Sequence, residues 1–459
     1  MEMRRHGWPL ALIAAALAAL AIGWIGYIAS DDALYYRGAL RWLVDPPFAG
    51  ANHWATRFPL TLTFAGMIAL LGKGYAAFAA TALLFYLALV VVTGVFARRV
   101  AGTRAGWIAA ILTATLPVIV SNATTVSVDL LEASALMLGI LLLTRGGDVM
   151  ALAGGTCFGV AILCRETSVL PLAGLAPLFL LGRPVPRRAL VLAGIGCALV
   201  LGVEAAFQYA LTGDPLRRYA IAFHHDEHID RAANREGNVL LWPPIDPLLV
   251  LLVNDDFGVL FWLLPAALAA RAVPPQGRGR MTVLGAMALA AFLLVAVLVH
   301  KLVLNPRYFT LPALAAVIVV AAWLARRRWG PLMLAGMVAA NLLLLSAANV
   351  HPRWTMEALV AASAAYPHET IAADRHNVLI ARESMQFAGR SNIRSGRTGL
   401  VIAEVDAAPR GTIVARYPSP PTRLGAAVRA LGLESLVPGA IARRMFRPNA
   451  DVVLVRTSG

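Results

Sequence analysis

Residues 8–36 have the sequence WPLALIAAALAALAIGWIGYIASDDALYY, an apolar run that ends in two adjacent carboxylates. The part from Trp8 to Ala29 is long enough to cross a bilayer as a helix, because about 20 apolar residues suffice. It is longer than the apolar region of a cleaved signal peptide, and no small-residue cleavage site follows it. We therefore expect a retained first membrane span with Asp31 and Asp32 at its far end.

The composition of the whole chain agrees with a membrane protein. Of 459 residues, 59% are hydrophobic and 14% are charged, whereas soluble globular chains are about half apolar and about a quarter charged. A purely soluble enzyme is therefore excluded, and we expect an all-α polytopic membrane protein with about 11 transmembrane helices. The ten spans after the first are predicted at residues 75–97, 105–121, 126–144, 149–163, 168–181, 189–211, 257–270, 281–299, 308–325 and 331–345.

The distribution of arginine gives the expected orientation. With the N-terminus in the cytoplasm, the cytoplasmic loops carry 15 basic and 2 acidic residues, a net charge of +13. The rest of the membrane part carries 11 basic and 15 acidic residues, a net charge of −4. Positive loops on the cytoplasmic side are typical of bacterial inner-membrane proteins. The formal net charge of +15 is therefore mostly a topology signal, and we expect no nucleic-acid partner and an outer C-terminus.

Two regions are expected in the chain. Residues 1–348 form the membrane part, with outer hydrophilic loops at 30–74 and 212–256. The uncharged run 59–72 within the first loop is too short to span a bilayer and suits an interfacial or re-entrant helix. Residues 349–459 are enough for one small domain, and their pattern predicts a periplasmic α/β fold without a catalytic constellation. Its predicted strands are 370–373, 412–415 and 452–455, and its predicted helices are 356–365, 378–387 and 423–431.

The acidic pair after the first span is the first candidate for chemistry. Two adjacent carboxylates at a membrane surface, Asp31 and Asp32, cost free energy unless they are solvated or have a functional role. They suit a general base or a metal ligand at the mouth of a cavity. An acidic first turn of a helix is the structural alternative. In that helix Tyr35 would lie on a face suited to the membrane surface.

A second acidic group lies at the start of the predicted fourth span. Asp129 and Glu132 are three residues apart, so one face of a helix presents both. Ionisable residues within a span are functional candidates and usually face a cavity. The structural alternative is that both carboxylates are hydrated, because they lie near the end of the helix.

Several polar side chains predicted on the outer side suit an anionic substrate. Arg165 and Glu166 interrupt two short apolar runs. Either the two side chains form an ion pair with each other, or Arg165 binds an anionic group. Arginine beside tyrosine suits phosphate or pyrophosphate, although side chains that anchor a helix at the membrane interface have the same pattern. The other candidate substrate-binding residues are Tyr35, His53, Arg57, Lys301, Arg307 and Tyr308.

No cofactor is certain from the sequence, and a divalent metal remains an open option. His224 and His228 would share one face of a helix and offer a weak two-ligand site, but a solvated charged helix explains them as well. The sequence contains no glycine-rich phosphate loop and no HExxH motif, so ATP-driven chemistry is not expected.

Short motifs follow one another in a definite order along residues 1–325. They are Asp31-Asp32-x-x-Tyr35-x-x-x-Ala39, His53, Arg57-Phe58-Pro59-Leu60, Leu71-Gly72, Ala97-Arg98-Arg99, Gly102-Thr103-Arg104-Ala105-Gly106, Pro117, Ser127-Val128-Asp129 and Pro306-Arg307-Tyr308-x-x-x-Pro312. This order resembles the C-type glycosyltransferase superfamily, and the most similar members are the protein O-mannosyltransferases and the lipid A aminoarabinose transferases.

The resemblance implies a polytopic enzyme of the cell envelope that takes a sugar from a polyprenyl-phosphate donor. The acceptor, a glycolipid such as lipopolysaccharide, a polysaccharide or a protein, is then reached on the periplasmic face. The catalytic acidic residue of the family corresponds to Asp31 in this sequence. The family's second acidic position corresponds to Asp129. Asp32 stands where relatives usually have glutamate, and Arg165 where many have a nearby lysine. Arg165, Lys301 and Arg307, together with Arg57, are cations suited to the lipid phosphate that leaves.

Two other functions fit parts of the sequence. A secondary transporter would show inverted repeats and acidic residues near the bilayer midplane, and neither is evident here. A polysaccharide ligase or polymerase would place its key residues in one large late loop, for which residues 212–256 are the candidate.

Overall fold

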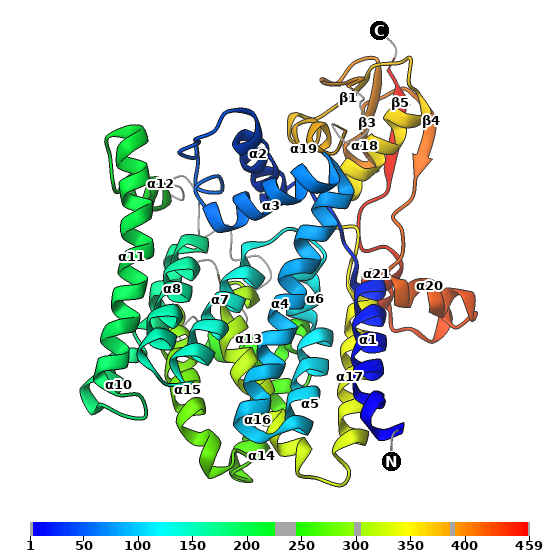
Figure 1. Ribbon diagram of the computed structural model, residues 1–459. Coiled ribbons are helices and arrows are strands. Elements are labelled where there is room, and N and C mark those ends of the chain that lie inside the picture. The colour runs from blue at the N-terminus through cyan, green and yellow to red at the C-terminus, as the bar shows by residue number, and fades with distance from the viewer. Residues whose placement is uncertain (1–2, 225–244, 298–303, 386–390, 458–459) are drawn as a thin grey trace.

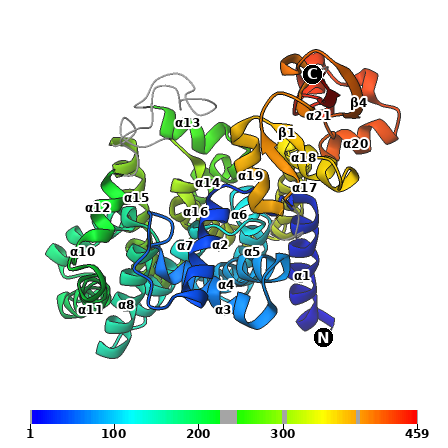
Figure 2. The same ribbon diagram turned by 90° about the horizontal axis from the view of Figure 1, so that it is seen from above.

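The computed structural model describes residues 3–224, 245–297, 304–385 and 391–457. Over these residues the chain is mostly helical. Long helices run side by side as a bundle, and a small sheet stands beyond one end of it (Figure 1). We call this the sheet end of the bundle. Two short helices, α2 (Asp31–Val44) and α3 (Phe58–Leu71), lie across the sheet end, as the view from above shows (Figure 2).

The bundle is built from helices that follow each other along the chain with short connections. They are α1 (Met3–Gly23), α4 (Tyr75–Ala101), α5 (Thr103–Thr115), α6 (Pro117–Ala123), α7 (Val128–Leu143), α8 (Asp148–Cys164), η1 (Glu166–Ser168), α9 (Val169–Leu172), α10 (Leu175–Leu181), α11 (Arg187–Thr212), α12 (Arg217–His224), α13 (Asp246–Val253), η3 (Asp255–Phe257), α14 (Leu260–Ala269), α15 (Pro275–Val297), η5 (Pro306–Phe309), α16 (Thr310–Ala325) and α17 (Gly330–Ala347).

Each predicted span coincides with a helix or a pair of helices. Within the described ranges, five helices are long and apolar enough to cross a membrane: α4, α11, α15, η5 with α16, and α17. A sixth results if α5 and α6, which are bent by 61° at their junction, count as one span. The other predicted spans coincide with shorter helices. A helical membrane part is therefore confirmed, whereas the number of 11 spans stays a prediction.

The first span differs in one respect from its prediction. Helix α1 ends at Gly23, and residues 24–30 leave the helix instead of continuing it to Ala29. The backbone N–H of Gly26 donates to the carbonyl oxygen of Thr124 at 3.1 Å, and Gly26 has a φ of +82° that favours glycine. A hydrogen bond to the end of α6 thus replaces the next turn of α1 and leads the chain into α2.

Small residues let the membrane helices pack closely. A Cβ atom on Gly155 of α8 would lie 1.8 Å from the carbonyl oxygen of Ala193 in α11, so the two backbones touch there. Such contacts are typical of helix pairs in lipid, where dispersion and packing replace the hydrophobic effect. Helix α16 is buried along most of its length at the centre of the bundle. The site described below lies at the sheet end of this rigid core.

The C-terminal region folds around one mixed sheet. Its strands are β1 (Ile371–Ala373), β2 (Ile393–Ser395), β3 (Leu400–Glu404), β4 (Thr412–Tyr417) and β5 (Val452–Arg456), in the order β2-β1-β3-β5-β4. Strand β1 pairs parallel with β2 and β3, and β5 pairs antiparallel with β3 and β4. Its helices are α18 (Trp354–Ala365), α19 (Arg375–Met385), η6 (Val405–Ala407), α20 (Arg423–Ala430), η7 (Glu434–Leu436) and α21 (Gly439–Phe446).

The sheet core also includes a residue of the membrane part. Ala29 lies in the same buried cluster as Leu359, Ile371 and Leu454. The chain between α1 and α2 is therefore held between the bundle and the sheet. Because Ala29 is two residues before Asp31, the C-terminal region helps to fix where α2 begins.

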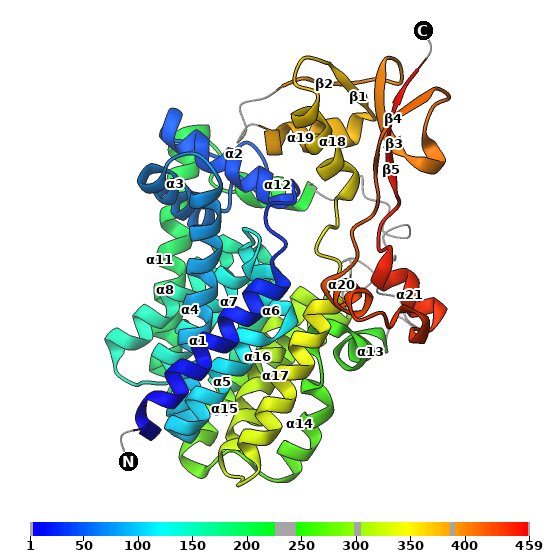
Figure 3. The ribbon, with the colours of Figure 1, turned by 90° about the vertical axis from the view of Figure 1, so that its right-hand side faces the viewer.

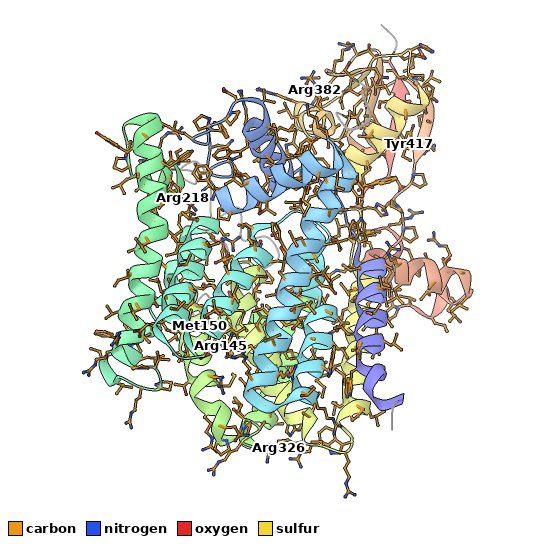
Figure 4. All side chains as sticks on the ribbon, in the orientation of Figure 1. Arg145, Met150, Arg218, Arg326, Arg382 and Tyr417 are labelled. Atoms are coloured by element: carbon orange, nitrogen blue, oxygen red, sulfur yellow. The ribbon has the colours of Figure 1, made fainter. Side chains whose placement is uncertain are left out.

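Arginine side chains at the two ends of the bundle are labelled in Figure 4. Arg145 and Arg326 lie at the end opposite the sheet, and Arg218 and Arg382 lie towards the sheet end (Figure 4).

Candidate functional site

Two carboxylates and two guanidinium groups from four separate segments meet at the sheet end of the bundle. The Nη1 atom of Arg165 lies 2.6 Å from Oδ1 of Asp129. The Nη1 atom of Arg307 lies 3.7 Å from Oδ2 of Asp31 and 3.9 Å from Oδ2 of Asp129. Arg307 therefore stands between the two carboxylates. Residues that are separated by up to 276 positions in the chain thus form one cluster.

Local capping fixes the segment that carries Asp129. Ser127 precedes α7, and its Oγ accepts a hydrogen bond from the backbone N–H of Asp129 at 3.2 Å. The same hydroxyl donates to the carboxylate of Asp129. A serine at this position suits a helix start, because it satisfies a backbone N–H that has no partner within the helix. The Asp129 carboxylate is buried and held by both Ser127 and Arg165.

Arg307 and Tyr308 are positioned by the short helix η5. The Oδ1 of Asn305 accepts a hydrogen bond from the backbone N–H of Arg307 at 3.1 Å, and Pro306 suits the first position of the turn. The hydroxyl of Thr310 donates to the carbonyl oxygen of Arg307 at 2.7 Å. The Arg165 guanidinium carbon lies 5.2 Å from the centroid of the Tyr308 ring, a cation–π distance.

Arg165 lies in extended backbone between α8 and η1, so its side chain is free of helical geometry. It does not pair with its neighbour Glu166, as one alternative from the sequence held. Its Nη1 also lies 3.4 Å from Oε2 of Glu132, and the hydroxyl of Ser168 donates to the other oxygen of Glu132. Asp129 and Glu132 do share one helical face, as their spacing predicts, and both face Arg165.

A small cavity of about 50 Å³ opens among these groups. Its polar lining includes Asp129, Glu132, Arg165, Arg307 and Tyr308, and its apolar lining includes residues of α9, α15 and α16. A volume of this size has room for a few water molecules. It suits a phosphate-sized group beside two guanidinium groups better than a whole lipid-linked sugar.

The two carboxylates of the acidic pair have different surroundings. Asp31 is 40% exposed and faces Arg307. Asp32 is buried, and its carboxylate accepts backbone N–H groups of Ile28, Ser30 and Ala33 at 2.8, 2.6 and 3.0 Å. Burial raises the pKa of Asp32 to about 6, although the three N–H donors oppose that shift. The oxygens of Asp32 thus hold the turn into α2, and Asp31 is the carboxylate that a substrate can reach.

Tyr35, His53 and Arg57 form a second polar group next to the first. Arg57 donates one hydrogen bond to the hydroxyl of Tyr35, and its other terminal nitrogen contacts Nε2 of His53. Burial raises the pKa of Tyr35 to about 12, so this hydroxyl stays protonated at neutral pH. These three residues, which the sequence places as substrate-binding candidates, are brought together and connect α2 to the start of α3.

The first turn of α12 contributes a residue that sequence reasoning misses. Arg218 is fully buried, and its Nε and Nη2 atoms lie 3.0 and 2.8 Å from the same Oε1 of Glu166. It also donates to the carbonyl oxygens of Thr56 and Ile162 at 3.1 and 3.0 Å. In the sequence it is one of two adjacent arginines in a charged loop, so nothing there distinguishes it from Arg217.

The remaining sequence candidates are Lys301, His224 and His228. Lys301 and His228 lie outside the described residues. The Nδ1 atom of His224 is 2.7 Å from the carbonyl oxygen of Ala220 within α12. Over the described ranges, no group of three or more His, Cys, Asp and Glu side chains has the arrangement of a metal site.

Comparisons with known proteins place the fold. No protein family profile matches the sequence, and no curated protein matches it. The fold is similar to ArnT from Cupriavidus metallidurans in the apo state, with 15% identity and a TM-score of 0.59 over 88% of this chain and 94% of that one. The same protein bound to undecaprenyl phosphate gives 16% identity and a TM-score of 0.60 over 89% and 96%.

A second similar structure is the oligosaccharyltransferase AglB of Archaeoglobus fulgidus, solved with an inhibitory peptide and a dolichol phosphate. It shares 13% identity and a TM-score of 0.53 over 88% of this chain and 70% of that one. Both neighbours are membrane glycosyltransferases of the C-type superfamily. The chain therefore shares its fold with these two structures, as its sequence motifs predict.

Proposed function

We propose that this protein is an integral membrane glycosyltransferase that moves a sugar from a polyprenyl-phosphate donor to an acceptor. The observation that carries the proposal is the meeting of Asp31, Asp129, Arg165 and Arg307 at one end of a helical bundle. A fold shared with transferases that were solved with polyprenyl phosphates supports a lipid-linked donor. The acceptor is a glycolipid, a polysaccharide or a protein, reached on the periplasmic face.

The reaction is a displacement at the anomeric carbon of the donor sugar. A hydroxyl or amine of the acceptor forms the new bond while its proton passes to the Asp31 carboxylate as general base. The bond between the anomeric carbon and the phosphate oxygen breaks, and the electron pair leaves with the lipid phosphate. Arg165 and Arg307 are placed to stabilise the charge that develops on this leaving group. We assign Asp129 the role of holding both arginines and Asp32 that of positioning Asp31.

An apolar groove is a suitable path for the donor chain. It has a volume of about 420 Å³ and is lined by α2, α3, α8 and α11. Its walls include Trp42, Phe58, Leu163 and Phe207. Phe58 is next to Arg57, and Leu163 is two residues before Arg165, so we infer that the groove opens towards the polar side chains at the sheet end. We propose that a prenyl chain lies here with its phosphate directed towards Arg165.

The orientation follows from the charge pattern and remains part of the proposal. We propose that the chain has about 11 spans, with the N-terminus in the cytoplasm and residues 349–459 as a periplasmic domain of an inner-membrane protein. Arg145 and Arg326 lie at the end opposite the sheet, as this orientation requires. The catalytic cluster then faces the periplasm.

The base assignment is tested by the substitution Asp31→Asn. In membranes supplied with radiolabelled undecaprenyl-phosphate sugars, we expect transfer to an endogenous acceptor to fall by about 10²- to 10⁴-fold, the usual contribution of a general base. Asp45→Asn is the matched control, because Asp45 is an exposed carboxylate at the other end of α2. Undiminished transfer by the Asp31 variant would refute the assignment. Uptake of the labelled sugar into liposomes without a covalent product would instead favour a transporter.

A further inference from the structure

Helices α20 and α21 form a hairpin that stands apart from the sheet. The backbone N–H of Thr422 donates to the carbonyl oxygen of Met445 at 2.8 Å, which ties the two ends of the hairpin together. A Cβ atom on Gly425 would lie 2.3 Å from the same oxygen, so the two helices meet backbone to backbone. We call residues 422–447 the α20–α21 hairpin.

The tip of the α20–α21 hairpin exposes large apolar side chains. Leu431 is 71% exposed and Leu436 is 75% exposed, and Leu433 and Ile441 are exposed as well. These four residues lie within 11 positions, between two helices whose other faces carry charge. Exposed apolar patches of this kind mark contact with a partner or a membrane.

The charges around the tip have one predominant sign. Residues 422–447 contain five arginines and one acidic residue, a net charge of +4. The acidic residue, Glu434, pairs with Arg429 at 2.9 Å. The positive charge therefore resides on Arg423, Arg443, Arg444 and Arg447, which are exposed or partly exposed at the hairpin surface. Short helices with leucine on one side and arginine on the other suit the boundary between lipid head groups and acyl chains.

The position of the hairpin is the decisive observation. Helix α20 packs against α17, which is long and apolar enough to cross a membrane. Both hairpin helices lie beside the sheet ends of α1 and α17, between the sheet and the body of the bundle (Figure 3). If α17 spans the membrane, the α20–α21 hairpin therefore lies at the depth of the membrane surface. A protein partner would need no such alignment with the ends of the spans.

We propose that the α20–α21 hairpin is a lipid-binding surface for the membrane leaflet on the sheet side. Leu431, Leu433, Leu436 and Ile441 insert among the acyl chains, and the surrounding arginines contact the phosphates of anionic phospholipids. Each basic residue near an anionic surface adds to the attraction, so binding strengthens with the anionic lipid content. The hairpin thereby anchors the C-terminal sheet, whose core holds Ala29 just before Asp31.

Site-specific fluorescence on the full-length protein in nanodiscs tests this surface. The background carries serine in place of Cys157, Cys164 and Cys197, and an NBD probe is attached at Leu436→Cys. Nanodiscs contain phosphatidylcholine alone or with phosphatidylglycerol. We expect the probe to be several-fold brighter than in water and to be quenched by shallow doxyl lipids. Arg410→Cys is the control, because this exposed residue lies two positions before β4, a strand of the sheet that stands beyond the end of the bundle (Figure 1), and its probe should stay unquenched.

Two further measurements make the outcome decisive. Arg443→Gln with Arg444→Gln should remove the part of the quenching that depends on phosphatidylglycerol and leave the rest. Hydrogen exchange of the wild-type protein, which needs no substitution, should be slower at residues 431–441 in phosphatidylglycerol nanodiscs than in phosphatidylcholine, with α18 unchanged. A Leu436 probe as unquenched as that at Arg410, together with equal exchange in the two lipids, would overturn the proposal. Shielding that rises with protein concentration would point to a second copy and would also overturn it.

Discussion

Arg165 and Asp129 form an ion pair with both side chains almost inaccessible to solvent. Such pairs are seldom retained for stability, because taking two charges out of water costs about as much as their attraction returns. Removing one partner is different, since it leaves an unpaired buried charge at a cost of about 3–5 kcal/mol. The pair, with Arg307 nearby, is therefore better explained by function than by stability, and it suits the proposed role of the two arginines in binding the leaving phosphate.

The pKa of Asp32 predicts how stability depends on pH. Its value of about 6 in the folded protein lies above the ordinary value of 3.8. The folded state thus binds the proton more tightly than the unfolded state, and stability falls as the pH rises from about 4 through 6. The full difference is about 3 kcal/mol, at 1.36 kcal/mol per pKa unit. Asp32→Asn removes the titrating group and should flatten this part of the profile.

Thermal unfolding in detergent between pH 4.5 and 8 measures this effect. Asparagine can accept only some of the hydrogen bonds that Asp32 accepts from Ile28, Ser30 and Ala33. The melting temperature of the Asp32→Asn variant should therefore be lower than that of the wild type at acidic pH. The slope against pH is the quantity to compare, with Asp45→Asn as the control of unchanged slope. Parallel profiles for the wild type and the Asp32 variant would contradict the assigned pKa.

Helix α12 acts on the site through η1. Arg218 connects Glu166, the neighbour of Arg165, to the carbonyl oxygens of Thr56 and Ile162. A displacement of about 1 Å at a reacting group can cost up to about 10²-fold in rate. We expect Arg218→Gln to lower kcat by about 10- to 100-fold with a smaller change in KM for the donor, because no contact to the donor itself is lost.

The conservative variant separates positioning from charge. Arg218→Lys keeps the charge but cannot reproduce the several hydrogen bonds of a guanidinium group, so it should recover only part of kcat. Arg41→Gln, a change of an exposed arginine in α2, serves as the control. Two results would contradict a positioning role for the Arg218 guanidinium group. One is that Arg218→Gln lowers donor affinity as much as kcat, and the other is that Arg218→Lys restores kcat fully.

The long helices are predictable because each is an apolar run with its own boundaries. Short elements are predicted less completely, since their stability comes from tertiary contacts. The predicted strands 370–373, 412–415 and 452–455 coincide with β1, β4 and β5, whereas β2 and β3 are not predicted from the sequence. Among the described residues, β2 has three residues and pairs with β1 alone, and β3 lies between β1 and β5. The end of α1 at Gly23 is likewise set by a hydrogen bond to Thr124, which no local pattern reveals.

The residues of the candidate site were also predictable only in part. Asp31, Asp129, Arg165 and Arg307 could be grouped because the predicted topology brings their span ends to one side of the membrane. The distances among them, the separate role of Asp32 and the contacts of Arg218 depend on packing between elements far apart in sequence. Topology therefore predicts which side chains share a compartment, and packing decides which of them touch.

At the scale of the whole molecule, the proposed orientation predicts the outcome of reporter fusions. Alkaline phosphatase joined after Thr457 should be active, because it folds only outside the cytoplasm, and green fluorescent protein at the same point should be dark. Fusions in the loops at Arg145 or Arg326 should give the opposite result. Active alkaline phosphatase at Arg326 would invert the assigned topology and place the cluster in the cytoplasm.

The contact between Glu166 and Arg218 has a consequence for how the chain is synthesised. Glu166 emerges from the ribosome 52 residues before its buried partner. Helices α9 and α10 that follow it are too short to cross a bilayer by themselves. The ion pair can therefore form only after Arg218 has been synthesised. We expect α9 and α10 to pack into the bundle only once α12 has followed them, because the charge of Glu166 is compensated at that stage.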